Sequence, residues 1–384
     1  MQRPARLLVF RSLFRRCWRW WRALFAASAT PLAAWALDPP VSPDAQPAVA
    51  QVLQFLAESS GQRILAGQQE TVDWYGRNND GEMNYLLRHT GKLPAIRSFD
   101  FMFYSHSEES RRGQRVAERA IEWHRQGGLV AICFHWFAGS PRSHFYTNRS
   151  DFNLNRALLP GTRDHAEFIQ DMDTVAEELK QLRDAGVPVI WRPFHEVSGG
   201  WFWWGAKGPE PFKLAWRAMF DRFTRVHELN NLIWCYNPTE HRGALENWYP
   251  GDDIVDLISL DLYPVLGRRS TYAQEYRRFR NFRHGRKVVA ISENGPIPDP
   301  DRMLADGAHW PFFSTWSGKF LTDGRTNPTD FLRRVYHHPK VITLDELPQL
   351  LTLPLPVAKM NESAEADEAP IEVAAEHVEP PTSG

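Results

Sequence analysis

Residues 164–196 read DHAEFIQDMDTVAEELKQLRDAGVPVIWRPFHE, and this stretch gives the clearest indication of the fold. Its first part, 164–185, is amphipathic and acid-rich at its start, which is typical of a helix. Gly186 and Pro188 stop that helix, and the run 187–195 that follows is mostly apolar. Runs of this length and composition form strands that are buried on both faces of a parallel sheet. The stretch therefore predicts a helix followed by a parallel strand.

The same alternation of short apolar runs and longer amphipathic segments recurs along the chain from about residue 63. Eight runs have the length of a strand. Eight strand and helix repeats predict an α/β protein that forms a single (β/α)8 barrel, a TIM barrel, rather than two domains. The apolar runs are 64–68, 93–101, 129–137, 187–195, 232–237, 255–263, 288–293 and 310–316, and the clearest helices are 113–126, 164–185, 210–228 and 272–283.

The composition excludes several classes of protein. The 384 residues are 43% hydrophobic and 24% charged, which excludes a disordered, collagen-like or multi-span membrane protein. The formal net charge is −1, and the part expected to fold has no long basic run, which argues against nucleic-acid binding. The chain has 16 Trp, and indoles that are not needed in a core often line surfaces that stack on sugar rings. A neutral partner fits this composition.

The two ends of the chain are predicted to lie outside the barrel. Residues 1–36 contain seven Arg, no acidic residue and an apolar stretch that ends in an A-x-A pattern, which indicates a secretory signal peptide cleaved after Ala36. An uncleaved membrane anchor and a basic amphipathic arm are the alternatives. We expect 37–50 to be a linker, 51–355 the barrel and 356–384 a disordered acidic tail. The mature protein would then be secreted or periplasmic, monomeric and not inserted in a membrane.

The cysteines give no sign of a metal site. Cys133 and Cys235 lie inside apolar runs and are predicted to be buried free thiols, with a disulfide between them as the alternative. The chain has no C-x-x-C pair and no zinc-ligand spacing. We expect neither a metal nor a cofactor.

Polar residues follow most of the predicted strands. In a barrel, reactive side chains gather at the C-terminal ends of the strands, so these residues would meet at one rim. Carboxylates, imidazoles and indoles are all present among them. The strand ends carry Arg97 and Asp100, His135 and Trp136, Arg192, His195 and Glu196, Tyr236 and Asn237, Asp261 and Tyr263, Glu293 and Asn294, and Trp316.

Two of these carboxylates can flank one bond of a substrate. Glu196 closes the fourth predicted strand and Glu293 the seventh, and these strands lie across the mouth of a barrel from each other. Such a pair can hydrolyse a glycosidic bond, because one group protonates the leaving oxygen while the other attacks the anomeric carbon or activates water. The alternative is that one glutamate forms a structural ion pair with Arg97 or Arg192.

The segment Trp191–Gly205, WRPFHEVSGGWFWWG, resembles the signature segment of glycoside hydrolase family 26, which is best known for endo-β-1,4-mannanases. The resemblance covers roughly residues 50–350. It implies a (β/α)8 barrel and a retaining mechanism by double displacement. Further stretches that resemble the family are Asn230–Trp234, Trp248–Tyr263, Ser292–Gly295 and Thr315–Trp316.

The resemblance assigns the two glutamates. Glu196 matches the general acid/base of the family, and Glu293 matches the nucleophile. Tyr263 matches the tyrosine that donates a hydrogen bond to the nucleophile. The two carboxyl groups of a retaining enzyme lie about 5 to 5.5 Å apart. We expect a raised pKa for Glu196, which is seated among indoles.

The resemblance also implies substrate-binding residues. Trp201 and Trp316 match aromatic side chains that wall the subsites beside the cleaved bond. His195 matches a histidine that contacts hydroxyls of the reacting sugar. His135 is expected to contact the sugar on the glycone side, or else to be a structural histidine satisfied by the backbone. Arg192 is expected to orient the nucleophile rather than to touch the sugar.

The implied activity is endo-hydrolysis of β-1,4-mannosidic bonds in mannan, glucomannan or galactomannan. The chain departs from better-known members at Val197-Ser198, where they often carry Met-Asn, and at Asn294. These departures put the flanking subsites in doubt. Mixed-linkage β-glucan and β-1,3-xylan are therefore alternative substrates for the same mechanism. A barrel that binds carbohydrate without catalysis is a third reading.

Overall fold

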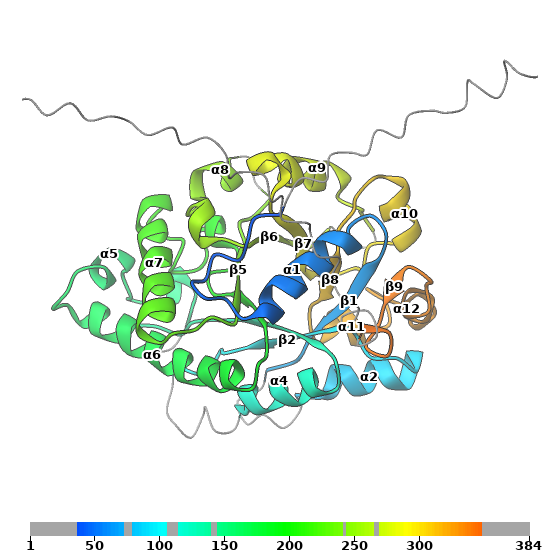
Figure 1. Ribbon diagram of the computed structural model, residues 1–384, viewed down its shortest axis with the longest axis horizontal. Coiled ribbons are helices and arrows are strands. Elements are labelled where there is room, and N and C mark those ends of the chain that lie inside the picture. The colour runs from blue at the N-terminus through cyan, green and yellow to red at the C-terminus, as the bar shows by residue number, and fades with distance from the viewer. Residues whose placement is uncertain are drawn as a thin grey trace, which may run out of the picture.

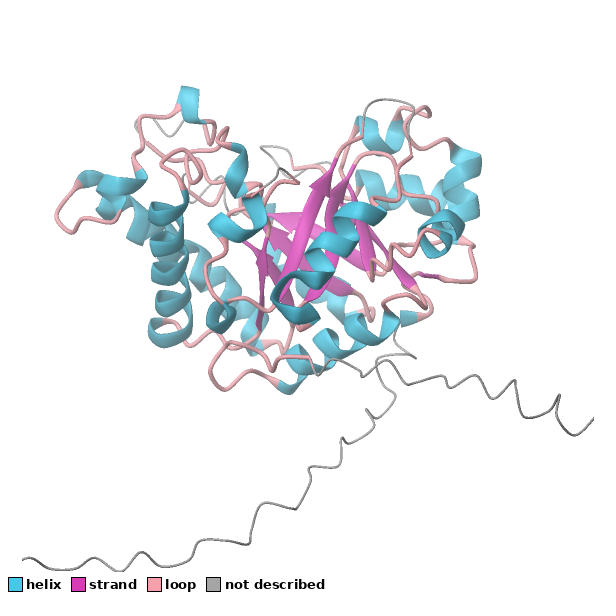
Figure 2. Cartoon of the chain, turned by 90° about the horizontal axis from the view of Figure 1, so that it is seen from above, coloured by secondary structure: helices cyan, strands magenta, loops and turns pink. Residues whose placement is uncertain are grey.

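The computed structural model describes residues 37–72, 79–105, 114–139, 144–240, 243–264 and 269–347. The expected signal peptide at 1–36 and the expected acidic tail at 356–384 lie outside the described residues. Figure 1 shows the strands gathered at the centre and the helices around them, and Figure 2 shows the same arrangement from a second direction.

The strands form one parallel sheet that closes on itself. Their order is β2-β3-β4-β5-β6-β7-β8-β1, and the additional pairing of β1 with β2 completes the ring. Each predicted apolar run overlaps one of these strands, so the predicted (β/α)8 barrel is confirmed. The strands are β1 (Ile64–Gln69), β2 (Ile96–Asp100), β3 (Leu129–Cys133), β4 (Val189–Arg192), β5 (Leu232–Tyr236), β6 (Leu257–Leu262), β7 (Val288–Asn294) and β8 (Phe312–Thr315), with a short β9 (Val341–Ile342) beside β1.

The fourth strand is shorter than the sequence pattern suggests. The apolar run extends to His195, but β4 ends at Arg192 and a turn follows. Pro193 explains the difference, because a proline has no backbone N–H and cannot donate to a neighbouring strand. The chain leaves the sheet there, and this turn carries His195 and Glu196 above the barrel.

Helices connect the strands on the outside of the barrel. The four helices expected from the sequence are present as α4, α6, α7 and α9, and α7 continues into a π-helical turn over Arg222–Val226. The long helix α6 begins after Thr162, whose side chain accepts a hydrogen bond from the backbone N–H of His165. The helices are α1 (Pro47–Ser59), α2 (Gly81–Thr90), α4 (Val116–Arg125), α5 (Leu154–Ala157), α6 (Arg163–Asp184), α7 (Pro209–Asp221), α8 (Ala244–Trp248), α9 (Ala273–Asn281), α10 (Pro300–Ala305), α11 (Lys319–Thr322) and α12 (Thr329–Tyr336).

Helix α1 closes the N-terminal end of the barrel. Its residues Val49, Val52 and Leu56 are buried against the apolar residues that begin the strands, such as Leu65 and Leu257. Figure 1 shows α1 over the middle of the ring of strands. With this end filled by apolar side chains, the C-terminal end is the one open to a substrate.

A second apolar core fills the space between the strands and the outer helices. Most of the described tryptophans belong to it, and Trp191, Trp216 and Trp234 are fully buried. Cys133 and Cys235 are buried free thiols, as predicted. In the described part of the chain, no helix combines the length and the apolar character that a membrane span requires.

Candidate active site

Glu293 lies near the end of β7 with its carboxylate held on both oxygens. The residue is 5% exposed. Arg192, the last residue of β4, forms an ion pair with Oε1. The hydroxyl of Tyr263, just past β6, donates a hydrogen bond of 2.9 Å to Oε2. These two donors come from different strands and fix the orientation of the carboxylate.

Arg192 is shared among several acceptors. One guanidinium nitrogen donates to Asp261 Oδ2 at 2.8 Å and to Asn237 Oδ1 at 2.9 Å, while another reaches Glu293. The guanidinium is almost completely buried under these partners. Arg192 therefore orients the carboxylate of Glu293. An ion pair between a glutamate and Arg192, which the sequence analysis considered as an alternative, is present between Arg192 and Glu293. Arg97, the other candidate for such a pair, binds Glu70 and Asp80 instead.

Asp261 is a buried acid that the sequence placed at the rim without a role. It ends the apolar part of β6 and accepts hydrogen bonds from Arg192, Asn237 and Ser292. Burial raises the pKa of Asp261 to about 7, against the opposing effect of the Arg192 cation. The position of Asp261 at a strand end indicates that it lies at the rim, but no sequence pattern shows that it forms an ion pair with Arg192.

Glu196 lies in the turn after β4, on a different side of the mouth from Glu293. Its backbone N–H donates to Asn237 Oδ1 at 3.0 Å, and its side-chain Oε2 accepts a hydrogen bond of 2.8 Å from the indole of Trp201. Burial, reinforced by the nearby charges of Asp261 and Glu293, raises the pKa of Glu196 to about 8. A carboxyl group with this pKa is protonated at neutral pH and can donate a proton.

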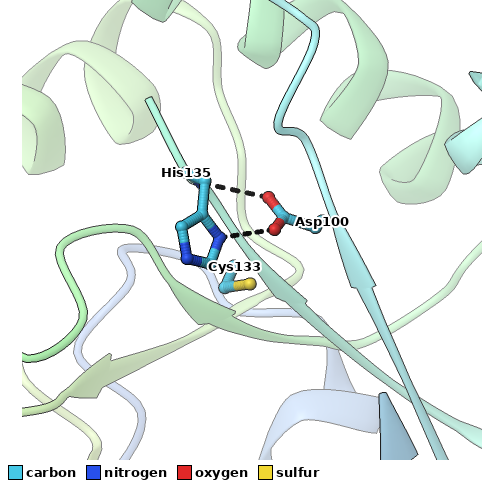
Figure 3. Close-up of side chains that lie close together, drawn as sticks. All are labelled: Asp100, Cys133 and His135. Carbon is cyan, nitrogen blue, oxygen red and sulfur yellow. Dashed lines mark hydrogen bonds and ion pairs between the residues drawn. The ribbon is translucent and has the colours of Figure 1, made fainter. Parts of the chain in front are cut away.

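Two histidines lie in the segments that follow β3 and β4, and the second, His195, directly precedes Glu196. His135, which follows β3, is bound to Asp100 at the end of β2. Its ring Nδ1 lies 2.6 Å from Asp100 Oδ2, and its backbone N–H donates to Oδ1 at 3.0 Å (Figure 3). The other ring nitrogen of His135 lies 3.1 Å from Nε2 of His195. The His195 ring is almost inaccessible, with 1% of the residue exposed, whereas His135 is 8% exposed.

Aromatic side chains line the mouth around these groups. Trp201 is 38% exposed and Tyr263 is 40% exposed, so both offer ring surface to a bound molecule. Trp316, which follows β8, is partly exposed and lies 5.7 Å from the His135 ring, centre to centre. Partly exposed aromatic rings beside carboxyl groups are suited to sugars, which present apolar C–H faces between polar hydroxyls. The structure therefore brings the predicted site residues together at one end of the barrel.

The loop after β3 forms backbone hydrogen bonds with the loop after β4, which carries Trp201. The backbone N–H of Thr147 donates to the carbonyl oxygen of Trp201 at 2.8 Å, and that of Trp203 donates to Phe145 at 3.1 Å. Tyr146 stacks on Phe202 with 5.5 Å between ring centres. These contacts join residues more than 50 positions apart, and the sequence analysis did not find them.

One group of side chains within the described residues has the composition of a metal site. Ligand atoms of Asp100, Cys133 and His135 lie within 4.8 Å of one another. However, both oxygens of Asp100 already accept hydrogen bonds from His135, and burial raises the pKa of the Cys133 thiol well above its usual value. A buried thiol in its protonated form is a poor metal ligand. The arrangement suits a hydrogen-bonded pair better than a cation.

The fold and this set of residues agree with a known family. The sequence model of Glycosyl hydrolase family 26 matches residues 41–346. The chain belongs to this family. One relative is a mannan endo-1,4-β-mannosidase of Thermothelomyces thermophilus, which is 38% identical to this chain over 321 residues. The matched residues cover 80% of this chain and 62% of that protein.

Solved structures of family 26 mannanases are similar to the whole barrel. The β-mannanase from a symbiotic protist of the termite Reticulitermes speratus has 33% identity and a TM-score of 0.76, with 82% of this chain and 99% of that chain covered. The β-(1,4)-mannanase of Podospora anserina has 34% identity and a TM-score of 0.74, with 83% of this chain and 70% of that chain covered. The family 26 chain spans only 50% to 62% of the length of the first three curated relatives.

Proposed function

We propose that this family 26 protein is a retaining endo-glycosidase that hydrolyses β-1,4-mannosidic bonds in mannan, glucomannan or galactomannan. The observation that carries the proposal is the unequal environment of its two glutamates. Glu293 meets a cation and a hydroxyl donor, whereas the pKa of Glu196 is raised to about 8. Environments that separate two carboxyl groups in this way assign one as nucleophile and the other as acid.

The first step forms a glycosyl-enzyme. The carboxylate of Glu293 attacks the anomeric carbon while the protonated Glu196 donates its proton to the leaving glycosidic oxygen. Arg192 and Tyr263 hold the attacking carboxylate in place. The leaving chain then carries the new hydroxyl, and the sugar is bound to Glu293 through an ester bond. We expect a distance of about 5 to 5.5 Å between the two carboxyl groups.

The second step returns the enzyme to its starting state. The negative charge of Glu293 is one cause of the raised pKa of Glu196, and this charge is absent from the ester. The pKa of Glu196 therefore falls in the intermediate, so that Glu196 can accept a proton from water. The resulting hydroxide equivalent attacks the anomeric carbon and releases Glu293. Two inversions at one carbon leave the configuration of the product unchanged.

The relatives support the mannan class of substrate. The curated relatives compared above are named mannan endo-1,4-β-mannosidases, and the protist enzyme was solved with a gluco-manno-oligosaccharide. Trp201 and Trp316 supply aromatic surface beside the glutamates, and we propose that they wall the subsites around the cleaved bond. We also propose that His135 and His195 contact hydroxyls on the reacting ring.

The substrate is tested by product analysis. The protein lacking residues 1–36 is incubated with mannan, glucomannan, galactomannan, mixed-linkage β-glucan and β-1,3-xylan. We expect short manno-oligosaccharides from the mannans, and β-configured first products by proton NMR. Products from β-glucan or xylan alone would overturn the substrate class and leave the mechanism in place. An α-configured first product would overturn the retaining mechanism, and the absence of products from every polymer would favour a barrel that only binds carbohydrate.

We further propose that the protein is exported and acts as a monomer. The support for export is the basic and then apolar pattern of residues 1–36 and its A-x-A ending. Mass spectrometry of the protein made with its full N-terminus should find a mature chain that starts at Leu37, and sedimentation should give the mass of one chain. An intact N-terminus in the membrane fraction would instead identify an anchor.

A further inference from the structure

The hydrogen bonds of His195 restrict where its proton can lie. Nε2 of the ring faces Nε2 of His135 at 3.1 Å. Nδ1 is buried and has no hydrogen-bond partner among the described residues. A buried N–H without an acceptor is rarer and more costly in proteins than a buried lone pair without a donor. The proton of a neutral His195 is therefore placed on Nε2, from which it is donated to His135.

This placement determines the proton of His135 as well. If Nε2 of His135 accepts from His195, it carries a lone pair, and the proton of a neutral His135 must be on Nδ1. Nδ1 lies 2.6 Å from a carboxylate oxygen of Asp100, which can only accept. The unpartnered Nδ1 of His195 and the carboxylate of Asp100 thus lead independently to the same proton positions, with His195 protonated on Nε2 and His135 on Nδ1.

We propose that Asp100 is a positioning residue for the glycosidase reaction: its carboxylate fixes the tautomer of His135, and through it that of His195, the residue that directly precedes Glu196. The bonds run from His195 Nε2–H to His135 Nε2, and from His135 Nδ1–H to Asp100. They connect the ends of three adjacent strands, β4, β3 and β2. The importance of this arrangement for turnover depends on the proposed function, whereas the proton positions do not.

The surroundings of the pair favour a neutral His195 ring. Burial, together with the neighbouring His135 and the Arg192 cation, lowers the pKa of His195 well below its usual value. The Cys133 thiol on the strand that leads to His135 has a strongly raised pKa and stays uncharged, and the pKa of nearby His144 in the loop after β3 is lowered. The acidic group in direct contact with the pair is Asp100, which is bonded to His135.

The replacement Asp100→Asn should reverse the proton positions. Asp100 accepts from both the backbone N–H and the ring Nδ1 of His135, and an asparagine offers only one oxygen for these two donors. The backbone N–H cannot change, but the ring can move its proton to Nε2. His135 would then donate to His195, whose proton would move to the buried and unpartnered Nδ1.

The experiment is nitrogen NMR of the protein with 15N-labelled histidine. Signals are assigned by the loss of one ring in the His135→Gln and His195→Gln variants. In the wild-type protein we expect protonated Nδ1 and bare Nε2 for His135, and the opposite for His195. Protonated Nε2 on His135 would overturn the proposal. Because this measurement requires neither a substrate nor the Asp100 variant, it decides the proposal even if the variant does not fold or the chain lacks glycosidase activity.

Activity provides the second readout. We expect Asp100→Asn to exchange the tautomers and to lower kcat/KM by about 10- to 100-fold, the effect of one hydrogen bond to a charged group. Asp256→Asn is the matched control, because Asp256 is a buried acid that accepts two backbone N–H groups near the N-terminal end of the barrel. The Asp256→Asn variant should lose about as much thermal stability as Asp100→Asn. It should keep the wild-type tautomers of His135 and His195 and the wild-type kcat/KM. Unchanged tautomers in Asp100→Asn, or an equal loss of kcat/KM in both variants, would show that Asp100 is merely structural.

Discussion

The side chain of Glu196 is directed by an unusual backbone conformation. Its φ of 51° and ψ of 32° lie in the left-handed region, where a residue with a Cβ atom costs roughly 1 to 3 kcal/mol. The hydrogen bond from its N–H to Asn237 helps to retain this conformation. The carboxyl group is thereby turned toward Trp201, and strain kept at such a position is typical of a functional residue.

Replacement of Glu293 by alanine should abolish turnover without unfolding the barrel. The variant removes the attacking carboxylate, so kcat should fall by several orders of magnitude. Arg192 keeps its bonds to Asp261 and Asn237, which should preserve the local structure. Rates are measured by release of reducing sugar, and calorimetry with a manno-oligosaccharide tests binding. Comparable wild-type and variant rates would disprove the assignment of Glu293.

Activity should decline as the pH rises through about 8. The proposed acid must be protonated to act, and the pKa of Glu196 is raised to about 8, so the active form is lost above that pH. The hydrogen bond from Trp201 to the ionised carboxyl lowers this pKa. Trp201→Phe removes the donor, so the alkaline limb of the kcat/KM profile should move to higher pH, by up to about one unit.

The control for this shift is Trp316→Phe. Trp316 packs near His135, whereas the indole that donates to Glu196 is that of Trp201, so the loss of the Trp316 indole should weaken substrate binding without moving the alkaline limb. A limb that moves to lower pH in Trp201→Phe would contradict the role of the indole donor.

At the scale of elements, the loops after β3 and β4 act as one unit. Thr147 N–H donates to Trp201, and Tyr146 stacks on Phe202, so the loop after β3 determines where the indole of Trp201 lies. The turn after β4 exists because Pro193 ends the strand. Positions of aromatic side chains in the mouth are thus set by contacts between loops.

Thr147→Pro should reduce activity more than stability. It removes the N–H that bonds Trp201, and we expect kcat/KM to fall about 10-fold, the effect of a misplaced contact worth roughly 1.4 kcal/mol. Thr147→Ala is the matched control, since it removes only the side-chain hydrogen bond to Gly200 and keeps the N–H. Thermal unfolding should change little in either variant. Equal kinetics for the two variants would argue against the backbone bond.

At the scale of the whole molecule, the segment before α1 is bonded to the N-terminal end of the barrel. Val41 N–H donates to one oxygen of buried Asp256 at 2.8 Å, and Trp234 N–H donates to the other at 2.8 Å. Gln46 N–H donates to the carbonyl of Asn230 at 2.9 Å. The segment 37–46, which the sequence pattern identifies only as a linker, therefore contributes to the closed end of the barrel.

Removal of residues 37–46 should destabilise the barrel. The deletion leaves one oxygen of Asp256 without its donor, at a cost of about 1 to 3 kcal/mol, and also frees the start of α1. We expect the unfolding temperature to fall by several degrees relative to the protein that starts at Leu37, as measured by calorimetry. The Val41→Ala variant retains the backbone N–H, so its unfolding temperature should fall less than that of the deletion. An unchanged unfolding temperature in the deletion would disprove a stabilising role.

The fold and the two glutamates could be predicted from the sequence by itself. Buried parallel strands require nearly continuous apolar runs, so the eight strands are visible as local patterns. Residues at strand ends in a barrel share one rim, which brought Glu196 and Glu293 together without knowledge of any contact. The signature around Trp191–Gly205 then identified the family.

Only the tertiary structure decided which side chains bind one another at that rim. It shows that Arg192 binds Glu293 and Asp261, that Asp100 binds His135, and that Tyr146 stacks on Phe202. Each partner lies on a different strand or loop, and its contact depends on side-chain direction and on turns such as the one after Pro193. Periodicity along the chain reports which face of an element is buried, but not which distant residue lies opposite.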